Sequence, residues 1–469
     1  MSHEHDKDSG NQEATQADVS STSRRNFLKI GLAGVGAAAV AATGVVAVKR
    51  MEGIPQDDFP QPLNDDYQPI DQRNQLATYA DSKAIYDKHP EREKAFNEML
   101  KKEDPDNYKP FNFYETRRTF KLVLPWDVPG YSQVDKALVF AGFSTSFQLL
   151  GSPFIDGVNS GVSTWEQKML ATHKHQFASP AEAASNIKRA ASLFGAVRCG
   201  ITKRDKRWDY DPLYDAQKET ELSWEKDFPF EPKTVIVFMA EMDYAAMATA
   251  PAWTADATVG DAYTEAIKIA GQMAVFLRGL GYKAVASLND LGVNPPYAVA
   301  AGLAEEARNG QVITPGYGPR VRISKVYTEL DFVEYDAPRD YGVESFCLHC
   351  MRCADSCPPK AITFGDKSWE PEYSTDPDYL WAACKGIYKF HNDAQKCAKF
   401  WMDNDGSCGS CIASCPYNKP DFWHHRLVDA QNVIAPGPVH AFMREMDILF
   451  GYGSVGDPDK VKRFWNQKS

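Results

Sequence analysis

The chain has 469 residues, which is enough for more than one domain and a sizeable buried core. Its composition, with 43% hydrophobic and 12% aromatic residues, is that of a globular protein and excludes a disordered or fibrous chain. The formal net charge is -11, and Lys and Arg are scattered along the chain, so the sequence lacks the basic footprint that a nucleic-acid partner requires.

The N-terminus carries the pattern of an export signal. Arg24 and Arg25 are followed by Phe27 and then by an apolar run, rich in Ala and Gly, over residues 30–48. This order is typical of a twin-arginine (Tat) signal peptide, which we place at residues 1–48. Such a run could instead anchor the chain in a membrane, but its Ala and Gly content makes it less apolar than an ordinary transmembrane helix. We therefore expect an exported protein that is peripheral to the membrane.

The middle of the chain has the pattern of an α/β core. Residues 49–110 are rich in Pro, Asp and Lys and predict an extended surface arm, and residues 111–340 predict the core, with the polar stretch 202–233 as an insertion or long loop. Apolar runs predict strands at 234–239, 283–287 and 321–327. An amphipathic helix is expected at 261–280, ended by Gly279 and Gly281, and a second helix at 297–308, stopped by Asn309 and Gly310.

Several common cofactor motifs are absent from this region. No G-x-G-x-x-G sequence lies between a strand and a helix, and there is no P-loop, which argues against a flavin or nicotinamide site of Rossmann type. The histidines His173, His175, His424 and His425 are interpreted as surface residues rather than as a metal site.

Cysteine spacing gives the most specific signal. Residues 347–358 have the form C-x2-C-x2-C-x3-C-P of bacterial ferredoxins, and a stretched second run ends in C-x2-C-x3-C-P at residues 408–416. Because the fourth cysteine of each run serves the other cluster, we predict two [4Fe–4S] sites. Cluster 1 takes Cys347, Cys350, Cys353 and Cys415, and cluster 2 takes Cys397, Cys408, Cys411 and Cys357.

Two other uses of these cysteines fit less well. Zinc sites use paired C-x2-C knuckles rather than a repeated four-cysteine run, and disulfides would be crowded within single turns. Cys199 and Cys384 lie outside the pattern and are expected to be small buried residues. The ferredoxin-like domain is placed at residues 341–425, with a C-terminal extension at 426–469.

The export signal, the α/β region and the paired cysteine runs together resemble the catalytic subunit of a corrinoid-dependent reductive dehalogenase. The resemblance covers essentially the whole chain. It is strongest in Arg278-Gly279-Leu280-Gly281-Tyr282, Ser287-Leu288-Asn289-Asp290, Ala301-Gly302-Leu303, Ile313-Thr314-Pro315-Gly316-Tyr317-Gly318 and Arg322-Ile323-Ser324-Lys325-Val326.

The resemblance implies a nitroreductase-like α/β (α+β) core that holds a base-off cobamide, followed by the bacterial-ferredoxin-like two-cluster domain. The implied activity is reductive dehalogenation of an organohalide in anaerobic respiration, at the outer face of the cytoplasmic membrane. A small membrane-anchor subunit and the Tat machinery are the implied protein partners, and a homodimer is allowed. The corrinoid is implied by the family alone, because the chain has no D-x-H-x-x-G motif.

The resemblance also implies three catalytic residues. Tyr263 matches the family's proton donor, and Asn289 and Arg322 match its two polar neighbours. A tyrosine is a reluctant acid at neutral pH, and a nearby guanidinium would stabilise the phenolate left after proton transfer. Tyr263 also lies on the apolar face of its predicted helix, where a tyrosine can simply pack in the core. Tyr244 is the alternative donor, and Trp401 is a weaker candidate for lining a substrate pocket.

Two other functions remain as alternatives. An epoxyqueuosine-reductase-like enzyme shares the corrinoid and iron–sulfur parts but acts on tRNA in the cytoplasm, which the export signal and the negative charge disfavour. An exported ferredoxin-type electron carrier would not need some 300 residues of α/β chain before its clusters. The sequence does not indicate which organohalide is the substrate.

Overall fold

A computed structural model of the chain describes residues 63–71, 128–149, 165–215, 220–375, 383, 385–420 and 437–466. These residues all belong to the larger of the chain's two structural units, residues 51–469. The predicted signal peptide, most of the predicted arm, Cys384, His424 and His425 lie outside the described residues.

The centre of the described structure is a four-stranded sheet in the order β1-β4-β8-β5, and every neighbouring pair is antiparallel. Its strands are β1 (Arg198–Lys203), β4 (Thr234–Glu241), β8 (Val321–Thr328) and β5 (Ala284–Ser287). The strands predicted at 234–239, 283–287 and 321–327 are therefore confirmed, and β1 is an additional edge strand.

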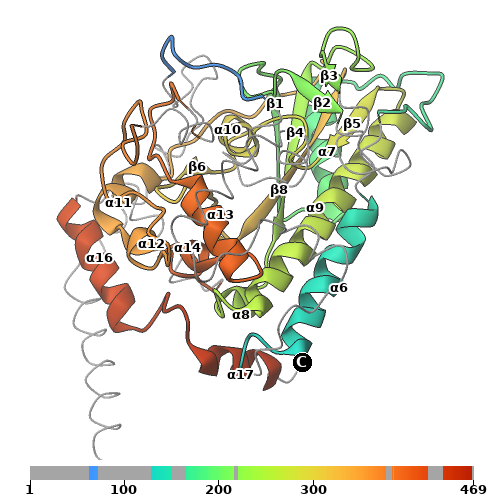
Figure 1. Cartoon of the computed structure of the whole chain (residues 1–469). Helices are drawn as coiled ribbons and strands as arrows, with labels where there is room; N and C mark the ends of the chain where they lie inside the picture. The colour runs from blue at the N-terminus through green and yellow to red at the C-terminus, as the bar shows by residue number, and fades with distance from the viewer. Residues whose placement is uncertain are drawn as a thin grey trace, which may run out of the picture. The chain divides into compact units, whose positions relative to one another are not determined.

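Successive side chains along β4 point to opposite faces of the sheet, and both faces are buried. Ile236 and Phe238 join the core beneath α7 (Pro180–Leu193) and α9 (Trp253–Gly279), whereas Val235 and Val237 join a second core on the other face. In Figure 1, α6 (Gln133–Leu149) runs along α9. A sheet covered on both faces explains why its strands read as continuous apolar runs.

The segment predicted as a polar loop, residues 202–233, contributes more structure than its composition indicated. It contains β2 (Leu213–Asp215) and β3 (Thr220–Leu222), which pair antiparallel. Its aromatic side chains fill the second core, where they are almost completely inaccessible to solvent. These buried residues are Trp208, Tyr210, Trp224 and Phe228.

The helix predicted at 261–280 is confirmed as the C-terminal part of α9, which begins earlier, at Trp253. The helix ends at Gly279, and Gly281 follows with a φ of +85°. A Cβ atom at this position would lie 2.4 Å from the carbonyl oxygen of His173, so only glycine fits the turn.

The second predicted helix, at 297–308, is wrong over most of its length. The observed helix α10 runs over Asn294–Ala300 and is followed by Gly302, with a φ of +66°. The chain then forms β6 (Glu305–Glu306), which pairs antiparallel with β7 (Val312–Ile313). The short hairpin of β6 and β7 replaces the second half of the helix expected from this Ala-rich segment.

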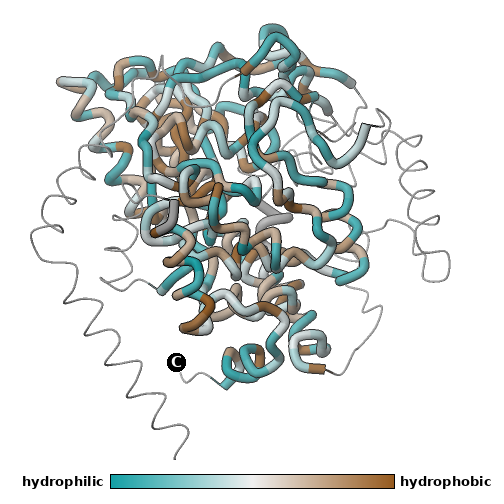
Figure 2. The backbone as a smooth tube through the Cα atoms, turned by 90° about the vertical axis from the view of Figure 1, so that its left-hand side faces the viewer, coloured by the Kyte–Doolittle hydropathy of each residue, from teal (hydrophilic) through white to brown (hydrophobic). Residues whose placement is uncertain are grey.

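The cysteine-rich segment consists of short helices joined by loops. These helices are α11 (Val343–Cys350), α12 (Arg352–Asp355), α13 (Ala394–Asp403) and α14 (Ser410–Ala413). Two further helices, α16 (Gly437–Leu449) and α17 (Pro458–Asn466), follow toward the C-terminus. In Figure 2 the apolar residues run through the interior elements, and the hydrophilic residues lie mainly on the surrounding loops. Among the described helices, none combines the length and the apolar character that a membrane crossing requires.

Candidate functional site

The cysteine side chains gather in two groups inside this segment. Burial raises the pKa of Cys415 well above its ordinary value, and the nearby thiolates of Cys347 and Cys350 raise it further. In the same way, burial raises the pKa of Cys397, with added effects from Asp393 and from three neighbouring cysteines. Those cysteines are Cys411, Cys408 and Cys357. The structure thus brings each fourth cysteine beside the members of the other run.

Cys353 lies between the two groups. Burial raises the pKa of its thiol, and both Cys415 of the first group and Cys411 of the second add to the shift. None of the nine cysteines in the described part of the chain forms a disulfide. Cys199 lies apart from both groups on β1, packed against the core beneath α7 and α9. Cys199 is partly buried rather than fully buried as expected, and its contacts are those of a packing residue.

Arg308 is a buried cation beside the first group. Its Nε atom donates a hydrogen bond to the carbonyl oxygen of Cys347 at 3.1 Å, and its Nη1 atom donates to the carbonyl oxygens of Thr363 and Gly365. The residue is 1% exposed, yet its Nη2 atom has no hydrogen-bond partner among the described residues. Buried thiols next to a cation with a spare donor are the surroundings that suit an anionic iron–sulfur cluster.

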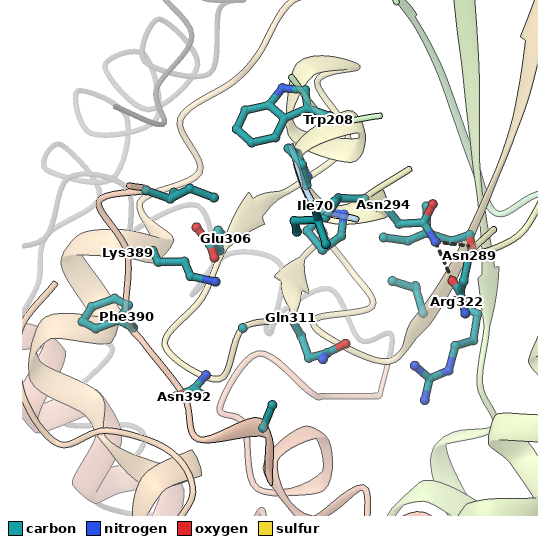
Figure 3. Close-up of a pocket in the computed structure, with 18 of the residues that line it drawn as sticks. Ile70, Trp208, Asn289, Asn294, Glu306, Gln311, Arg322, Lys389, Phe390 and Asn392 are labelled. Carbon is teal, nitrogen blue, oxygen red and sulfur yellow. Dashed lines mark hydrogen bonds between the residues drawn. The ribbon is translucent and has the colours of Figure 1, made fainter. Parts of the chain in front are cut away.

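A cavity lies between the α/β core and the cysteine-rich segment (Figure 3). It encloses about 1120 Å³ of space free of protein atoms, part of which is open to solvent. Asn289 and Arg322 lie on one side of the view, and Glu306 and Lys389 lie on the other. Residues of both regions line it, so a group bound there would contact the α/β core and the cysteine-rich segment together.

The three residues predicted as catalytic meet at this cavity, although they come from three different elements. Tyr263 lies on α9, Asn289 follows β5, and Arg322 lies on β8. The Asn289 Nδ2 atom donates a hydrogen bond of 3.4 Å to the Tyr263 hydroxyl oxygen. The Arg322 guanidinium lies over the Tyr263 ring, 4.9 Å from its centre. An amide donor and a cation are therefore both placed against the phenol.

Arg322 also connects the cavity with the second group of cysteines. Burial raises the pKa of Cys411 to about 12, nearby thiolates raise it, and the positive charge of Arg322 lowers it. The Nε atom of Arg322 is buried without a hydrogen-bond partner in the part of the chain that the structure describes. This N–H group at the cavity wall is therefore available to donate a hydrogen bond to a bound molecule.

The remaining sequence candidates lie elsewhere. Tyr244 begins α8 (Tyr244–Met247), beneath the guanidinium of Arg320, and is not among the residues that line the cavity. Trp401, on α13, does not line it either. His173 and His175 are exposed, as predicted.

Two residues at the site were given no role by the sequence. Asn294 opens α10 and lines the cavity, and Lys325 is completely buried in the central strand β8. A lysine in the middle of an apolar strand is a signal that could have been noticed, because lysine is rarely buried without polar partners. Nothing near Asn294 in the sequence indicates its partners.

Comparisons with known proteins agree with this arrangement. Residues 346–419 match the family model of the 4Fe-4S dicluster domain. The chain is 35% identical over 354 residues to the tetrachloroethene reductive dehalogenase of Desulfitobacterium hafniense (strain Y51), covering 65% of this chain and 63% of that protein. It is 32% identical over 316 residues to the tetrachloroethene reductive dehalogenase of Sulfurospirillum multivorans, covering 62% and 60%. The chain thus spans less than two thirds of these relatives' lengths.

Solved structures show the same fold. A catabolic reductive dehalogenase in complex with 3-bromo-4-hydroxybenzoic acid superposes with a TM-score of 0.61 at 20% identity, covering 89% of this chain and 51% of that one. Together these findings confirm the predicted fold class, a mixed α/β core with a ferredoxin-like dicluster segment. The chain is therefore a relative of the reductive dehalogenases and carries a 4Fe-4S dicluster domain at residues 346–419.

Proposed function

We propose that the protein removes halide from an organohalide by reduction, at a corrinoid that is supplied with electrons by two [4Fe–4S] clusters. The net reaction converts a carbon–halogen bond into a carbon–hydrogen bond and free halide, and consumes two electrons and one proton. The observation that carries the proposal is the meeting of Tyr263, Asn289 and Arg322 at a cavity next to buried cysteines.

The eight cysteines of the two groups are the proposed cluster ligands. Cluster 1 takes Cys347, Cys350, Cys353 and Cys415, and cluster 2 takes Cys397, Cys408, Cys411 and Cys357. This division is supported by the thiolates that surround Cys415 and Cys397. Because ligand thiols must be deprotonated, iron would stabilise charges that burial alone disfavours. The spare donor of Arg308 beside Cys347 supports the same assignment.

The cavity is the proposed corrinoid site. Its wall carries the ammonium group of Lys389, which suits the amide oxygens of the substituents around a corrin ring. A bound corrinoid would supply low-valent cobalt, which delivers electrons to the carbon–halogen bond. The chain's own residues would then orient the substrate, limit the access of water and provide the proton.

Tyr263 is the proposed proton donor. Its hydroxyl oxygen accepts the hydrogen bond from Asn289, and its ring lies under the guanidinium of Arg322. Both interactions stabilise negative charge on the oxygen after the proton leaves. Tyr244, which lies outside the cavity lining, is the less suitable donor.

A related family offers a second candidate function. The chain is 28% identical over 142 residues to the epoxyqueuosine reductase of Lactococcus garvieae (strain Lg2), covering 27% of this chain. The net charge of -11 disfavours a tRNA substrate. The longer and closer similarity to tetrachloroethene reductive dehalogenases favours dehalogenation.

The location and the partners of the protein are part of the proposal. The twin-arginine pattern at residues 24–25 supports export through the Tat machinery. We propose that the protein is held peripherally at the outer face of the cytoplasmic membrane by a small anchor subunit. A homodimer is compatible with this arrangement.

The test is to produce the protein anaerobically with a corrinoid and to measure bound iron, bound cobalt and halide release. Tetrachloroethene and a panel of aryl halides serve as substrates, and a reduced viologen serves as the electron donor. We expect Tyr263→Phe to keep iron and cobalt and to lose about a hundredfold or more in turnover, since it lacks the donated proton. Tyr244→Phe is the matched control, and its rate of halide release should equal that of the unchanged protein.

Two outcomes would overturn parts of the proposal. Protein without bound cobalt, or loaded protein that releases no halide from any member of the panel, would exclude dehalogenation. Normal turnover by Tyr263→Phe would remove this tyrosine from the mechanism while leaving the activity in place.

A further inference from the structure

The amide group of Asn289 has two polar ends, and only one of them can stabilise the phenolate of Tyr263. The nitrogen end donates to the phenol oxygen and leaves the hydroxyl proton unengaged. The oxygen end would accept that proton and hold it away from the substrate. The side chains behind Asn289 therefore decide whether Tyr263 can act as an acid.

Lys325 is the first of these side chains. It is 0% exposed, and its ammonium group has three hydrogens and meets three oxygen acceptors. It donates to the carbonyl oxygen of Leu288 at 3.2 Å, to that of Gly292 at 2.9 Å and to the Oδ1 atom of Asn294 at 2.5 Å. Because an ammonium group can only donate, the atom of Asn294 that faces it must be the oxygen.

Asn294 passes this constraint on to Asn289. With its oxygen toward Lys325, its nitrogen must point the other way, where one of its two hydrogens is shared between the carbonyl oxygens of Leu288 at 3.0 Å and Ile323 at 3.3 Å. The same nitrogen donates to the Oδ1 atom of Asn289 at 2.7 Å (Figure 3). The oxygen end of Asn289 is thereby occupied, and its nitrogen end faces Tyr263.

We propose that Lys325 and Asn294 are positioning residues that hold the Asn289 amide with its nitrogen toward the Tyr263 oxygen, so that the hydroxyl proton stays free for transfer. The orientation of both amides follows from the obligate donor, Lys325, at one end of the chain of hydrogen bonds. The inference rests on the proposed role of Tyr263 and adds two residues that do not touch the substrate themselves.

The charge state of Lys325 fits this role. Burial lowers its pKa to about 8, and the carboxylates of Asp290 and Asp209 oppose that shift. At neutral pH the group therefore keeps the three hydrogens that its three acceptors use. Asp290 is itself fixed beside the loop, since its Oδ1 atom accepts hydrogen bonds from Ser287 and from the backbone of Leu288.

The decisive variant is Asn294→Asp, which keeps the size of the side chain and its contact with Lys325 but removes the donor toward Asn289. We expect the Asn289 side-chain amide to flip, so that its oxygen accepts a hydrogen bond from the Tyr263 hydroxyl group. Turnover of tetrachloroethene by the corrinoid-loaded enzyme should then fall about tenfold to a hundredfold, with KM and the iron and cobalt contents unchanged. The solvent deuterium isotope effect on kcat should rise, because proton transfer becomes slower.

A double-mutant cycle separates positioning from direct action. If Asn294 acts only through Asn289, Asn294→Asp should cause no further loss of turnover in an Asn289→Ala background. Equal losses in both backgrounds would show that Asn294 acts by another route and would overturn the inference.

Lys325→Met tests the other end of the chain of hydrogen bonds. It should lower kcat in the same direction and raise the same isotope effect. The matched control is Lys136→Met, because Lys136 is also buried, at 2% exposure, but lies outside the cavity lining. The control should lose thermal stability without any change in the isotope effect.

The outcomes distinguish this inference from the proposed function. Loss of turnover in Tyr263→Phe together with normal kcat and an unchanged isotope effect in Asn294→Asp would overturn the positioning role alone. Normal turnover in Tyr263→Phe would overturn the role of the tyrosine and the inference with it. A Lys325→Met variant that does not fold leaves Asn294→Asp to decide.

Discussion

Lys325 in the core and Arg308 beside the cysteine-rich segment are two buried cations that differ in how fully the chain provides acceptors for their hydrogens. In the core, each hydrogen of Lys325 has an acceptor supplied by the chain. Beside the cysteine-rich segment, Arg308 keeps a buried Nη2 atom without a partner among the described residues, next to the Cys347 thiol, whose pKa is raised by burial. Buried polar groups are normally paired. Lys325 is therefore satisfied by the chain itself, whereas the donor left on Arg308 suits a charged group from outside the chain.

The largest expected effect comes from removing a proposed cluster ligand. Cys408→Ser should lose the iron of one cluster, which is about half of the total, and abolish turnover. Iron and sulfide analysis of anaerobically purified protein measures this directly. Cys199→Ser is the matched control, since Cys199 lies apart from both groups, and it should keep all of its iron. Unchanged iron in Cys408→Ser would contradict the ligand assignment.

The core should be most sensitive at Asp209, which is 2% exposed. It accepts hydrogen bonds from Arg204 at 2.6 Å, from Tyr297 at 2.6 Å and from Tyr327 at 2.9 Å. Asp209→Ala should cost about 3–5 kcal/mol in the free energy of unfolding, because it takes the buried carboxylate partner from Arg204 and the acceptor from two buried tyrosines.

Thermal unfolding of the loaded protein checks this value. Glu225→Gln is the control, because it removes an ion pair to Lys206 in which both side chains are exposed, and it should leave the melting temperature nearly unchanged. Similar shifts in the two variants would contradict the view that the core depends on its buried ion pair.

Acid should destabilise the protein through His391. Burial lowers the pKa of this histidine from 6.5 to about 4, so the unfolded chain takes up a proton before the folded protein does. Its contribution to stability is present above pH 6.5 and is lost as the pH falls toward 4; at pH 5 the loss is about 2 kcal/mol. His391→Gln should flatten this dependence. The melting temperature of both proteins at pH 7 and pH 5 provides the test, and parallel losses would exclude His391 as the cause.

The smallest expected effect is on a reduction potential. Arg308→Met removes a positive charge beside Cys347 and should make the potential of one cluster more negative. A tenfold change in the reduction equilibrium corresponds to about 59 mV for one electron. Redox titration followed by electron paramagnetic resonance measures the shift. Arg278→Met is the control, because Arg278 is also buried but donates to Glu166 and Ala284, away from the cysteines.

The sequence predicted the parts of the site that short motifs or family resemblance encode. Cysteine spacing predicted the two groups of thiols that the structure brings together, and the resemblance pointed to Tyr263, Asn289 and Arg322. The sequence did not predict the contact of Lys325 with Asn294, because that contact joins β8 to the start of α10 through tertiary packing. The helix expected at 297–308 failed for a similar reason, since local preference could not reveal the pairing of β6 with β7.

Arg322 acts on two parts of the site at once. Its guanidinium stands over the phenol ring on one side and affects the thiol of Cys411 on the other. Removing its charge would alter the acid that serves the substrate and, at the same time, the nearest proposed iron site. A loss of rate at position 322 therefore reports on two events together, and attempts to broaden the substrate range will do better at cavity residues farther from the cysteines.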